Sequence, residues 1–376
     1  MNIRSVSVDI LAVLTCLSGS WSCGGNGDSS LERRQTIGAG QIEECKSDED
    51  RNDPALVSRR VAVVCTQPDD QITFAREVPH LVWLDPSARS NSKLFVFMPG
   101  FTNRPDMYQL LGKEAARLGY HSIGLMYQNN ARPMRSLGRG PAAPCGQDPG
   151  QDPALDCSES FLREIIEGQA VAILPADSLK NHVLVTIPNS IDNRLTKLLR
   201  YLDEKYPAEG WSSFLHHGEP KWSKIAVAGH STGGELAAMI GKLRHVDRVV
   251  MFSASPDGAD AWVSIDKTPA AKHFGLVHER DPFTDLTFTV GSLASFRALQ
   301  MERFGDPVLV ESSPPPYGGT HILLTDLLPQ TGSYDHPFAH GSTVRDSFTP
   351  LDIDGTPRLL DAWRYLIGRE PEDEDR

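Results

Sequence analysis

Residues 225–243 read IAVAGHSTGGELAAMIGKL, in which an apolar run is followed by a serine between glycines and then by a helical pattern. The apolar run predicts a strand, and the residues after the second glycine predict a helix. A serine on so sharp a strand-to-helix turn has a strained backbone, so the residues two before and two after it must be small. Gly229 and Gly233 meet that requirement. The stretch predicts a nucleophilic Ser231 above the N-terminus of a helix, with an ordinary glycine-rich turn as the alternative.

Further strands and helices alternate on both sides of this stretch. Apolar runs predict strands at 61–64, 81–84, 94–98, 122–127, 248–252, 274–277 and 307–310. Helices are predicted between Pro105 and Gly119, over 191–202 with Ser190 as N-cap, and over 359–367. This alternation implies an α/β fold, with a mostly parallel central sheet and helices on both faces.

Composition limits the classes of function. The chain has 376 residues, 40% of them hydrophobic, which is enough for one large core with a tail or for two domains. Its net charge of −12, without a basic stripe, argues against nucleic acid as a partner. No CxxC motif occurs and no histidine pair lies near the cysteines in sequence, so a metal site is not predicted, and nothing implies an organic cofactor. Residues 369–376 form an acidic tail.

The N-terminal sequence predicts export. Residues 1–22 combine the positive charge of Arg4, a mostly apolar stretch and small residues, as in a signal peptide. Cys23, followed by glycines and a polar linker over 23–55, resembles the lipid-attachment cysteine of a bacterial lipoprotein. We therefore expect a secreted protein, or a periplasmic or outer-membrane lipoprotein attached to the membrane through Cys23.

Four cysteines remain beyond the signal region, namely Cys45, Cys65, Cys145 and Cys157. An even number in an exported protein predicts disulfides, and four cysteines allow three pairings. The local pairs 45–65 and 145–157 are favoured, since the second would close a loop rich in proline and aspartate.

A serine nucleophile needs a base, and the base needs an orienting group. Asp281 follows the predicted strand 274–277 and is the expected acid, with Glu279 and Asp257 as alternatives. His321 follows the predicted strand 307–310 and is the expected base, with His336 and His340 as alternatives. His230 lies inside the turn and is expected to pack or bond locally.

Two backbone N–H groups should stabilise the oxyanion that such chemistry produces. One is expected from Thr232, directly after the nucleophile, and the other from Phe101, in the loop that follows the strand 94–98. A plain Pro-Gly turn at that loop is the alternative.

With these features in this order, the chain resembles the α/β-hydrolase superfamily, and within it a poorly characterised bacterial group of α/β-hydrolase-domain proteins. The resemblance is carried by residues 94–100, 118–127, 193–202, 229–233, 278–281 and 315–321. It implies an α/β-hydrolase domain over 56–368. Residues 129–190 either form a cap whose apolar residues line a pocket, or contribute an amphipathic helix to the core; those residues are Phe161, Leu162, Ile165 and Ile166.

The sequence thus predicts an exported serine hydrolase that cleaves a small-molecule carboxylic ester through an acyl-enzyme. The same residues would also support hydrolysis of amides, peptides, thioesters or lactones. A non-catalytic surface protein that uses the hydrolase fold for binding is the alternative from another class.

Overall fold

The computed structural model describes residues 61–130, 157–168, 185–254, 263–282 and 292–368. The segments predicted as signal peptide (1–22), linker (23–55) and acidic tail (369–376) lie outside these residues, as do Cys23, Cys45 and Cys145. Every described residue belongs to one compact unit.

The centre of the described region is a nine-stranded sheet in the order β1-β2-β4-β3-β7-β8-β9-β11-β10. Both pairings of β2 are antiparallel, and the remaining pairings are parallel. The strands are β1 (Val61–Val64), β2 (Pro79–Trp83), β3 (Leu94–Met98), β4 (His121–Gly124), β7 (Ile225–His230), β8 (Arg248–Phe252), β9 (His273–His278), β10 (Val308–Leu309) and β11 (Ile322–Thr325). A separate hairpin pairs β5 (Leu215–His216) with β6 (Glu219–Pro220).

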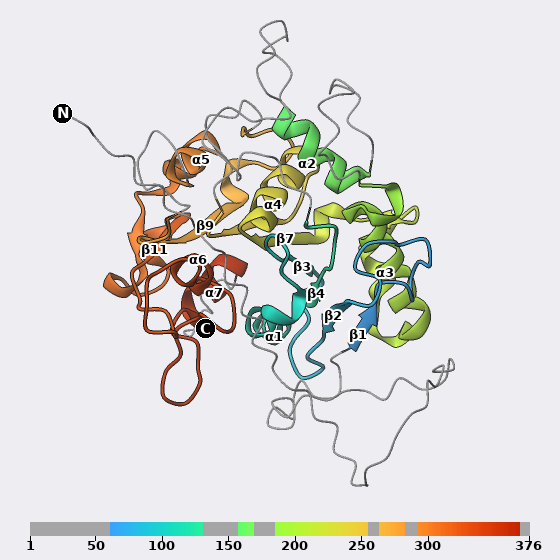
Figure 1. Ribbon diagram of the computed structural model, residues 1–376, viewed down its shortest axis with the longest axis horizontal. Helices are drawn as coiled ribbons and strands as arrows, with labels where there is room; N and C mark the ends of the chain where they lie inside the picture. Colours follow the sequence, from blue (N-terminus) through green and yellow to red (C-terminus); the bar gives the residue numbers. More distant parts are fainter. Residues whose placement is uncertain (1–60, 131–156, 169–184, 255–262, 283–291, 369–376) are drawn as a thin grey trace, which may run out of the picture. The chain divides into compact units, whose positions relative to one another are not determined.

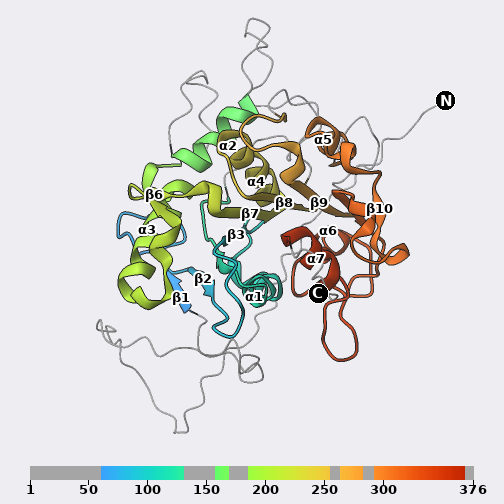
Figure 2. The ribbon, with the colours of Figure 1, turned by 180° about the vertical axis from the view of Figure 1, so that it is seen from behind.

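Helices cover both faces of the sheet, as predicted (Figures 1 and 2). In β3, Val96 contributes to the core on one face, while its neighbours Phe95 and Phe97 contribute to the core on the other. The helices are α1 (Gln109–Arg117), α2 (Cys157–Glu167), α3 (Ile191–Lys205), α4 (Thr232–Leu243), α5 (Ser292–Ala298), α6 (Phe338–Ser342) and α7 (Leu360–Ile367). The core with Val96 includes residues of α2, α3, α4 and α5, and the other includes residues of α1 and α7.

Most predicted elements are confirmed. The Ser190 side chain caps α3 by accepting a hydrogen bond from the Asn193 N–H at 3.2 Å. The predicted apolar face of α3 is fully buried. The difference lies after residue 300, where β10 is only two residues long and the additional strand β11 begins directly after His321.

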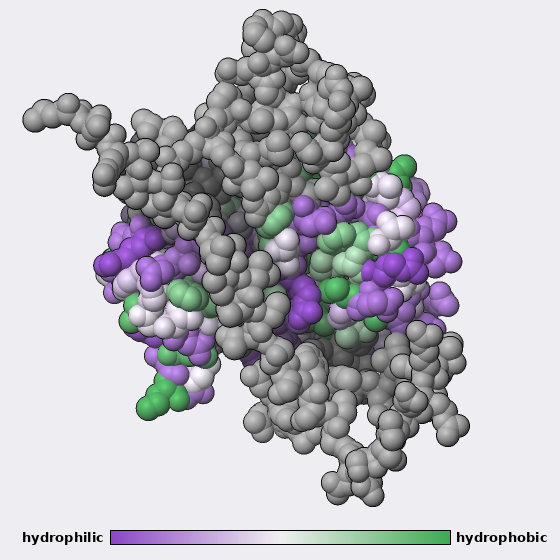
Figure 3. Space-filling model, in the orientation of Figure 1, coloured by the Kyte–Doolittle hydropathy of each residue, from purple (hydrophilic) through white to green (hydrophobic). Residues whose placement is uncertain are grey.

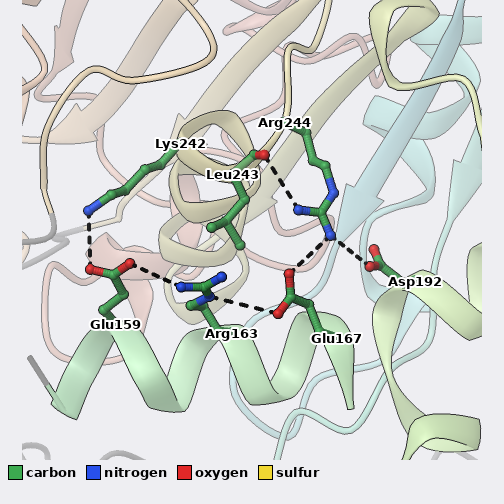
Figure 4. A network of polar contacts seen from close by, with 7 residues as sticks. All are labelled: Glu159, Arg163, Glu167, Asp192, Lys242, Leu243 and Arg244. Carbon is green, nitrogen blue, oxygen red and sulfur yellow. Dashed lines mark hydrogen bonds and ion pairs between the residues drawn. The ribbon is translucent and has the colours of Figure 1, made fainter. Parts of the chain in front are cut away.

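The described part of the 129–190 region packs as a core helix. α2 contacts α3 and α4, and its apolar residues join their core; these are Phe161, Leu162, Ile165 and Ile166. Charged side chains reinforce this docking, because Lys242 pairs with Glu159 at 3.2 Å and Arg244 pairs with Glu167 at 3.2 Å (Figure 4). For α2, the amphipathic-helix interpretation is therefore correct.

The structure gives no support to the predicted disulfide between Cys65 and Cys45, which lies outside the described residues. Cys65 is a free, buried thiol beside Ile72 and Met126. Its Sγ donates a hydrogen bond to the Val78 carbonyl at 2.9 Å and accepts one from Arg194 at 3.2 Å. Burial raises the pKa of this thiol to about 11, so it stays protonated at neutral pH. Cys157 begins α2, and its predicted partner Cys145 lies outside the described residues.

Few large apolar side chains are exposed in the described part of the chain, namely Ile187, Leu328 and Ile353. On the face in Figure 3, hydrophilic residues cover most of the described surface, with smaller apolar areas between them. No helix in the described ranges is both long and apolar enough to cross a bilayer.

Candidate active site

Ser231 lies where the sequence predicts it, between the end of β7 at His230 and the start of α4 at Thr232. Its backbone has φ 53° and ψ −125°, a conformation that residues with a side chain rarely adopt. Such a conformation costs on the order of 1–3 kcal/mol and is maintained only when the surrounding structure enforces it.

Two glycines make this turn sterically feasible. A Cβ atom at Gly229 would collide with the backbone of Gly233, and a Cβ atom at Gly233 would collide with the carbonyl groups of Met98 and Pro99. The N-terminus of α4 therefore packs directly on the loop that follows β3. This close approach brings together the segments of the two predicted oxyanion donors, Phe101 and Thr232.

Side chains from the residue before α1 and from the segment after β4 hold the loop after β3. Asn129 donates hydrogen bonds to the carbonyls of Gly100 at 2.9 Å and Asn103 at 2.7 Å. The Tyr127 hydroxyl donates to the Pro99 carbonyl at 2.7 Å. The Gly100 N–H faces the Tyr108 hydroxyl at 3.4 Å. The loop that contains Phe101 is thus fixed at several backbone positions.

Asp281 follows β9 and is almost fully buried, as an orienting acid should be. Its N–H donates to the His278 carbonyl at 3.0 Å, which closes a tight turn. The His278 ring supports that turn, because its Nδ1 accepts from the Arg280 N–H at 2.9 Å and its Nε2 lies 3.0 Å from the Leu327 carbonyl. Glu279, an alternative acid, is exposed, and Asp257, the other alternative, lies outside the described residues.

The histidine that meets Asp281 is His340 of α6. Its Nδ1 lies 2.7 Å from Asp281 Oδ2, and the carboxylate has no exposed surface. An ionised carboxylate only accepts, so Nδ1–H is the donor and Nε2 carries the lone pair. This is the tautomer in which a histidine can take a proton from a serine hydroxyl.

The prediction that His321 is the base is wrong in this geometry. β9 and β11 are parallel, and His321 precedes β11, so it lies at the edge of the sheet opposite to Ser231 and Asp281. Its Nδ1 lies 2.9 Å from the His273 carbonyl. Its ring is stacked between Phe274 and Phe304, with centroids 4.0 Å away on each side. Burial lowers the pKa of His321 to about 4, which suits a neutral packing residue.

Tertiary contacts hold the segment that carries His340. The His340 carbonyl lies 3.0 Å from Nε2 of His230, which is next to Ser231 in sequence. The Ser253 hydroxyl lies 2.8 Å from the Thr343 hydroxyl, and the Trp363 indole N–H donates to the Thr343 carbonyl at 2.9 Å. His336, the other alternative base, lies beside His340, with ring centroids 6.4 Å apart.

On the sequence His340 is only an alternative to His321, although the residues after His321 carry a usable signal. Residues 322–325 are apolar and β-prone, and they follow His321 directly. If residues 322–325 form the last parallel strand, the base is expected in the segment after Thr325. Among the described residues, no group of His, Cys, Asp or Glu is arranged to hold a metal ion.

Comparisons with known proteins add little. No protein-family model and no curated protein matches the chain. One similar solved structure is the crystal structure of esterase B from Lactobacillus rhamnosis with a C4-C4 SN3 tributyrin phosphonate inhibitor. It is 12% identical, with a TM-score of 0.36, and the match covers 79% of this chain and 83% of that chain. At this level of similarity, function has to be inferred from the site itself.

Proposed function

We propose that this protein is a serine hydrolase that cleaves carboxylic esters through an acyl-enzyme. Ser231 is the nucleophile, His340 the general base and Asp281 the group that orients it. The contact of 2.7 Å between Asp281 and His340, two buried side chains next to the strained Ser231 turn, carries the proposal. Structural histidines are common, but a histidine oriented by a buried carboxylate beside such a serine is the arrangement that this chemistry requires.

The order of the strands supports an α/β-hydrolase fold as the scaffold. In that fold the nucleophile, the acid and the histidine follow one another along the chain. Here Ser231 follows β7, Asp281 follows β9, and His340 comes after β11. These three strands belong to one region of the sheet, in which neighbouring strands run parallel. The three residues therefore come from the carboxyl ends of the strands, where α/β sheets bind ligands.

The proposed reaction has two steps. His340 Nε2 takes the proton of the Ser231 hydroxyl as the oxygen attacks the ester carbonyl, and Asp281 stabilises the imidazolium. The N–H groups of Thr232 and Phe101 are the proposed donors to the oxyanion. His340 then gives the proton to the departing alcohol, and a water molecule activated by the same histidine releases the acid.

Ester turnover tests this function. The full chain should hydrolyse p-nitrophenyl esters with a burst of p-nitrophenol, and Ser231→Ala should show neither burst nor turnover. Matching p-nitroanilides, compared at equal acyl length, separate esterase from amidase activity. A folded parent chain that hydrolyses no ester of any chain length would contradict the proposal.

Export and lipid attachment belong to the same proposal. Residues 1–22 are proposed to be removed as a signal peptide, with Cys23 as the acylated first residue. Mass spectrometry of the mature N-terminus tests this, since a mature chain that begins elsewhere, or an unmodified Cys23, would contradict the lipid anchor.

A further inference from the structure

His230 is a buried histidine that contacts two parts of the site at once. It is only 2% exposed. Its Nε2 lies 3.0 Å from the carbonyl of His340, and its Nδ1 lies 3.0 Å from the hydroxyl of Tyr108. The ring thus links the segment that carries His340 with Tyr108, whose hydroxyl contacts the loop after β3. The proposed reaction assigns it no part.

The hydrogen bonds around His230 have a fixed direction. A carbonyl oxygen only accepts, so His230 Nε2–H is the donor to His340. Burial holds the pKa of His230 well below its usual value, although the hydrogen bond to the His340 carbonyl opposes this shift, so the ring is neutral. Its Nδ1 is therefore an acceptor, and the Tyr108 hydroxyl donates to it. The Tyr108 oxygen in turn accepts from the Asn103 side-chain amide at 2.6 Å.

The same ring also sets the position of the loop after β3. A Cβ atom at Gly100 would lie 2.9 Å from His230 Nδ1, so the backbone of that loop packs directly on the imidazole. The loop, the nucleophile turn and the base segment accordingly share one side chain. A substitution at His230 is therefore expected to shift the backbone of all three segments.

We propose that His230 is a positioning residue, which aligns the main chain of His340 with Ser231 and with the loop that carries Phe101. This inference rests on the proposed function. Asp281 orients the His340 ring, while His230 holds the His340 backbone from the residue next to the nucleophile. Both constraints are needed because α6 is only five residues long and its N-cap residue makes no side-chain capping bond.

Two substitutions separate the two hydrogen bonds of His230. In His230→Gln the side-chain amide nitrogen takes the place of Nε2 and retains the donor to His340. In His230→Asn the side-chain oxygen takes the place of Nδ1 and retains only the acceptor for Tyr108. A misplacement of about 1 Å costs about 100-fold in rate. We expect His230→Asn to lower kcat for p-nitrophenyl esters by about that factor, His230→Gln by about tenfold, and both to leave KM unchanged within about twofold.

Tyr108→Phe tests the other end of the chain of hydrogen bonds. We expect kcat to fall by about tenfold, the equivalent of one lost hydrogen bond. In the His230→Gln background the same change should cost less, because Nδ1 is already absent and the two effects are coupled.

Matched control variants outside the site measure the effect of losing a buried hydrogen bond on stability alone. His121 Nε2 lies 2.7 Å from the Glu209 carbonyl, and the Tyr120 hydroxyl donates to the Ile367 carbonyl at 2.8 Å. Both are buried groups outside the site. His121→Gln, His121→Asn and Tyr120→Phe should lower Tm to a similar extent as the His230 and Tyr108 variants and leave kcat unchanged.

The outcomes distinguish the two proposals. An active parent whose His230→Asn variant keeps its kcat, or loses kcat no more than His230→Gln, would overturn the positioning role alone. The positioning role would also be overturned if the control variants lost as much kcat as the His230 and Tyr108 variants for the same fall in Tm. A folded parent that turns over no ester contradicts the proposed function itself.

Discussion

Asp281 and His340 stand 59 positions apart in the chain, yet their side chains meet at 2.7 Å. The parallel sheet accounts for this contact. β9 and β11 are neighbours, so the segments that leave their carboxyl ends emerge side by side. Asp281 lies in the turn directly after β9, and the chain after β11 returns over the same edge with His340.

Asp281→Asn should reduce catalysis without unfolding the site. An amide can donate to Nδ1 and favour the wrong tautomer of His340, and in serine hydrolases this exchange costs about 10⁴-fold in kcat. We expect a loss of about 10³–10⁴-fold in ester hydrolysis, with the far-ultraviolet circular dichroism spectrum unchanged. Glu279→Gln is the control, since Glu279 is exposed, and a similar loss there would contradict the assignment of the acid.

Gly233→Ala should destabilise the nucleophile turn. The added Cβ would collide with backbone carbonyls of Met98 and Pro99, which cannot rotate away as a side chain would. We expect a loss of about 1–3 kcal/mol in the free energy of unfolding, together with most of the activity. Urea denaturation measures the first, and an unchanged midpoint would show that α4 does not pack so closely on this loop.

Asp346 should stabilise α1 from outside the helix. Its carboxylate accepts from the N–H groups of Gln109 at 2.8 Å and Leu110 at 3.2 Å, the first two residues of α1. Asp346→Ala should therefore cost about 1–2 kcal/mol in urea denaturation. Asp306→Ala is the control, because Asp306 is exposed and lies outside the helices. Equal effects of the two variants would contradict the capping role.

We expect the Asp192 carboxylate, close to α2, to make the stability of the protein depend on pH. Its Oδ2 pairs with Arg244 at 3.0 Å, while its Oδ1 has no hydrogen-bond partner among the described residues (Figure 4). Burial raises the pKa of Asp192 to about 6, although Arg244 opposes the shift. The folded state therefore binds this proton more tightly than the unfolded chain, whose aspartate pKa is about 3.9.

The parent should accordingly lose stability relative to Asp192→Asn as the pH rises from about 4 to about 6, and the difference should be constant above that. Thermal melts of both proteins across this range measure the difference in Tm. The exposed Asp266→Asn serves as control. A difference between parent and Asp192→Asn that does not change with pH would contradict the shift.

Local sequence patterns account for much of the fold. The strand, serine and helix of 225–243 were predictable because steric demands at Ser231 leave few choices for the flanking residues. The α3 face and its Ser190 cap followed from helical periodicity and capping chemistry. Asp281 was predictable because it directly follows a strand with a strong apolar pattern.

The proposed base was not predictable in the same way. His340 lies 15 positions after the end of β11, on a short helix, so local sequence does not determine its position. His230 contacts its carbonyl, and Ser253 and Trp363 bind Thr343 at the end of the same helix; all three come from other parts of the chain. His321 was favoured because β11 was not recognised, and the position of a histidine before or after a strand decides which edge of the sheet it reaches.

The rate of labelling by a fluorophosphonate probe tests the central claim most directly. We would compare the parent chain with Ser231→Ala, His340→Gln and His321→Gln below their melting temperatures. The account predicts fast labelling of the parent and of His321→Gln, a loss of about 10³-fold or more in His340→Gln, and no labelling of Ser231→Ala. Labelling that His321→Gln abolishes and His340→Gln retains would contradict the account.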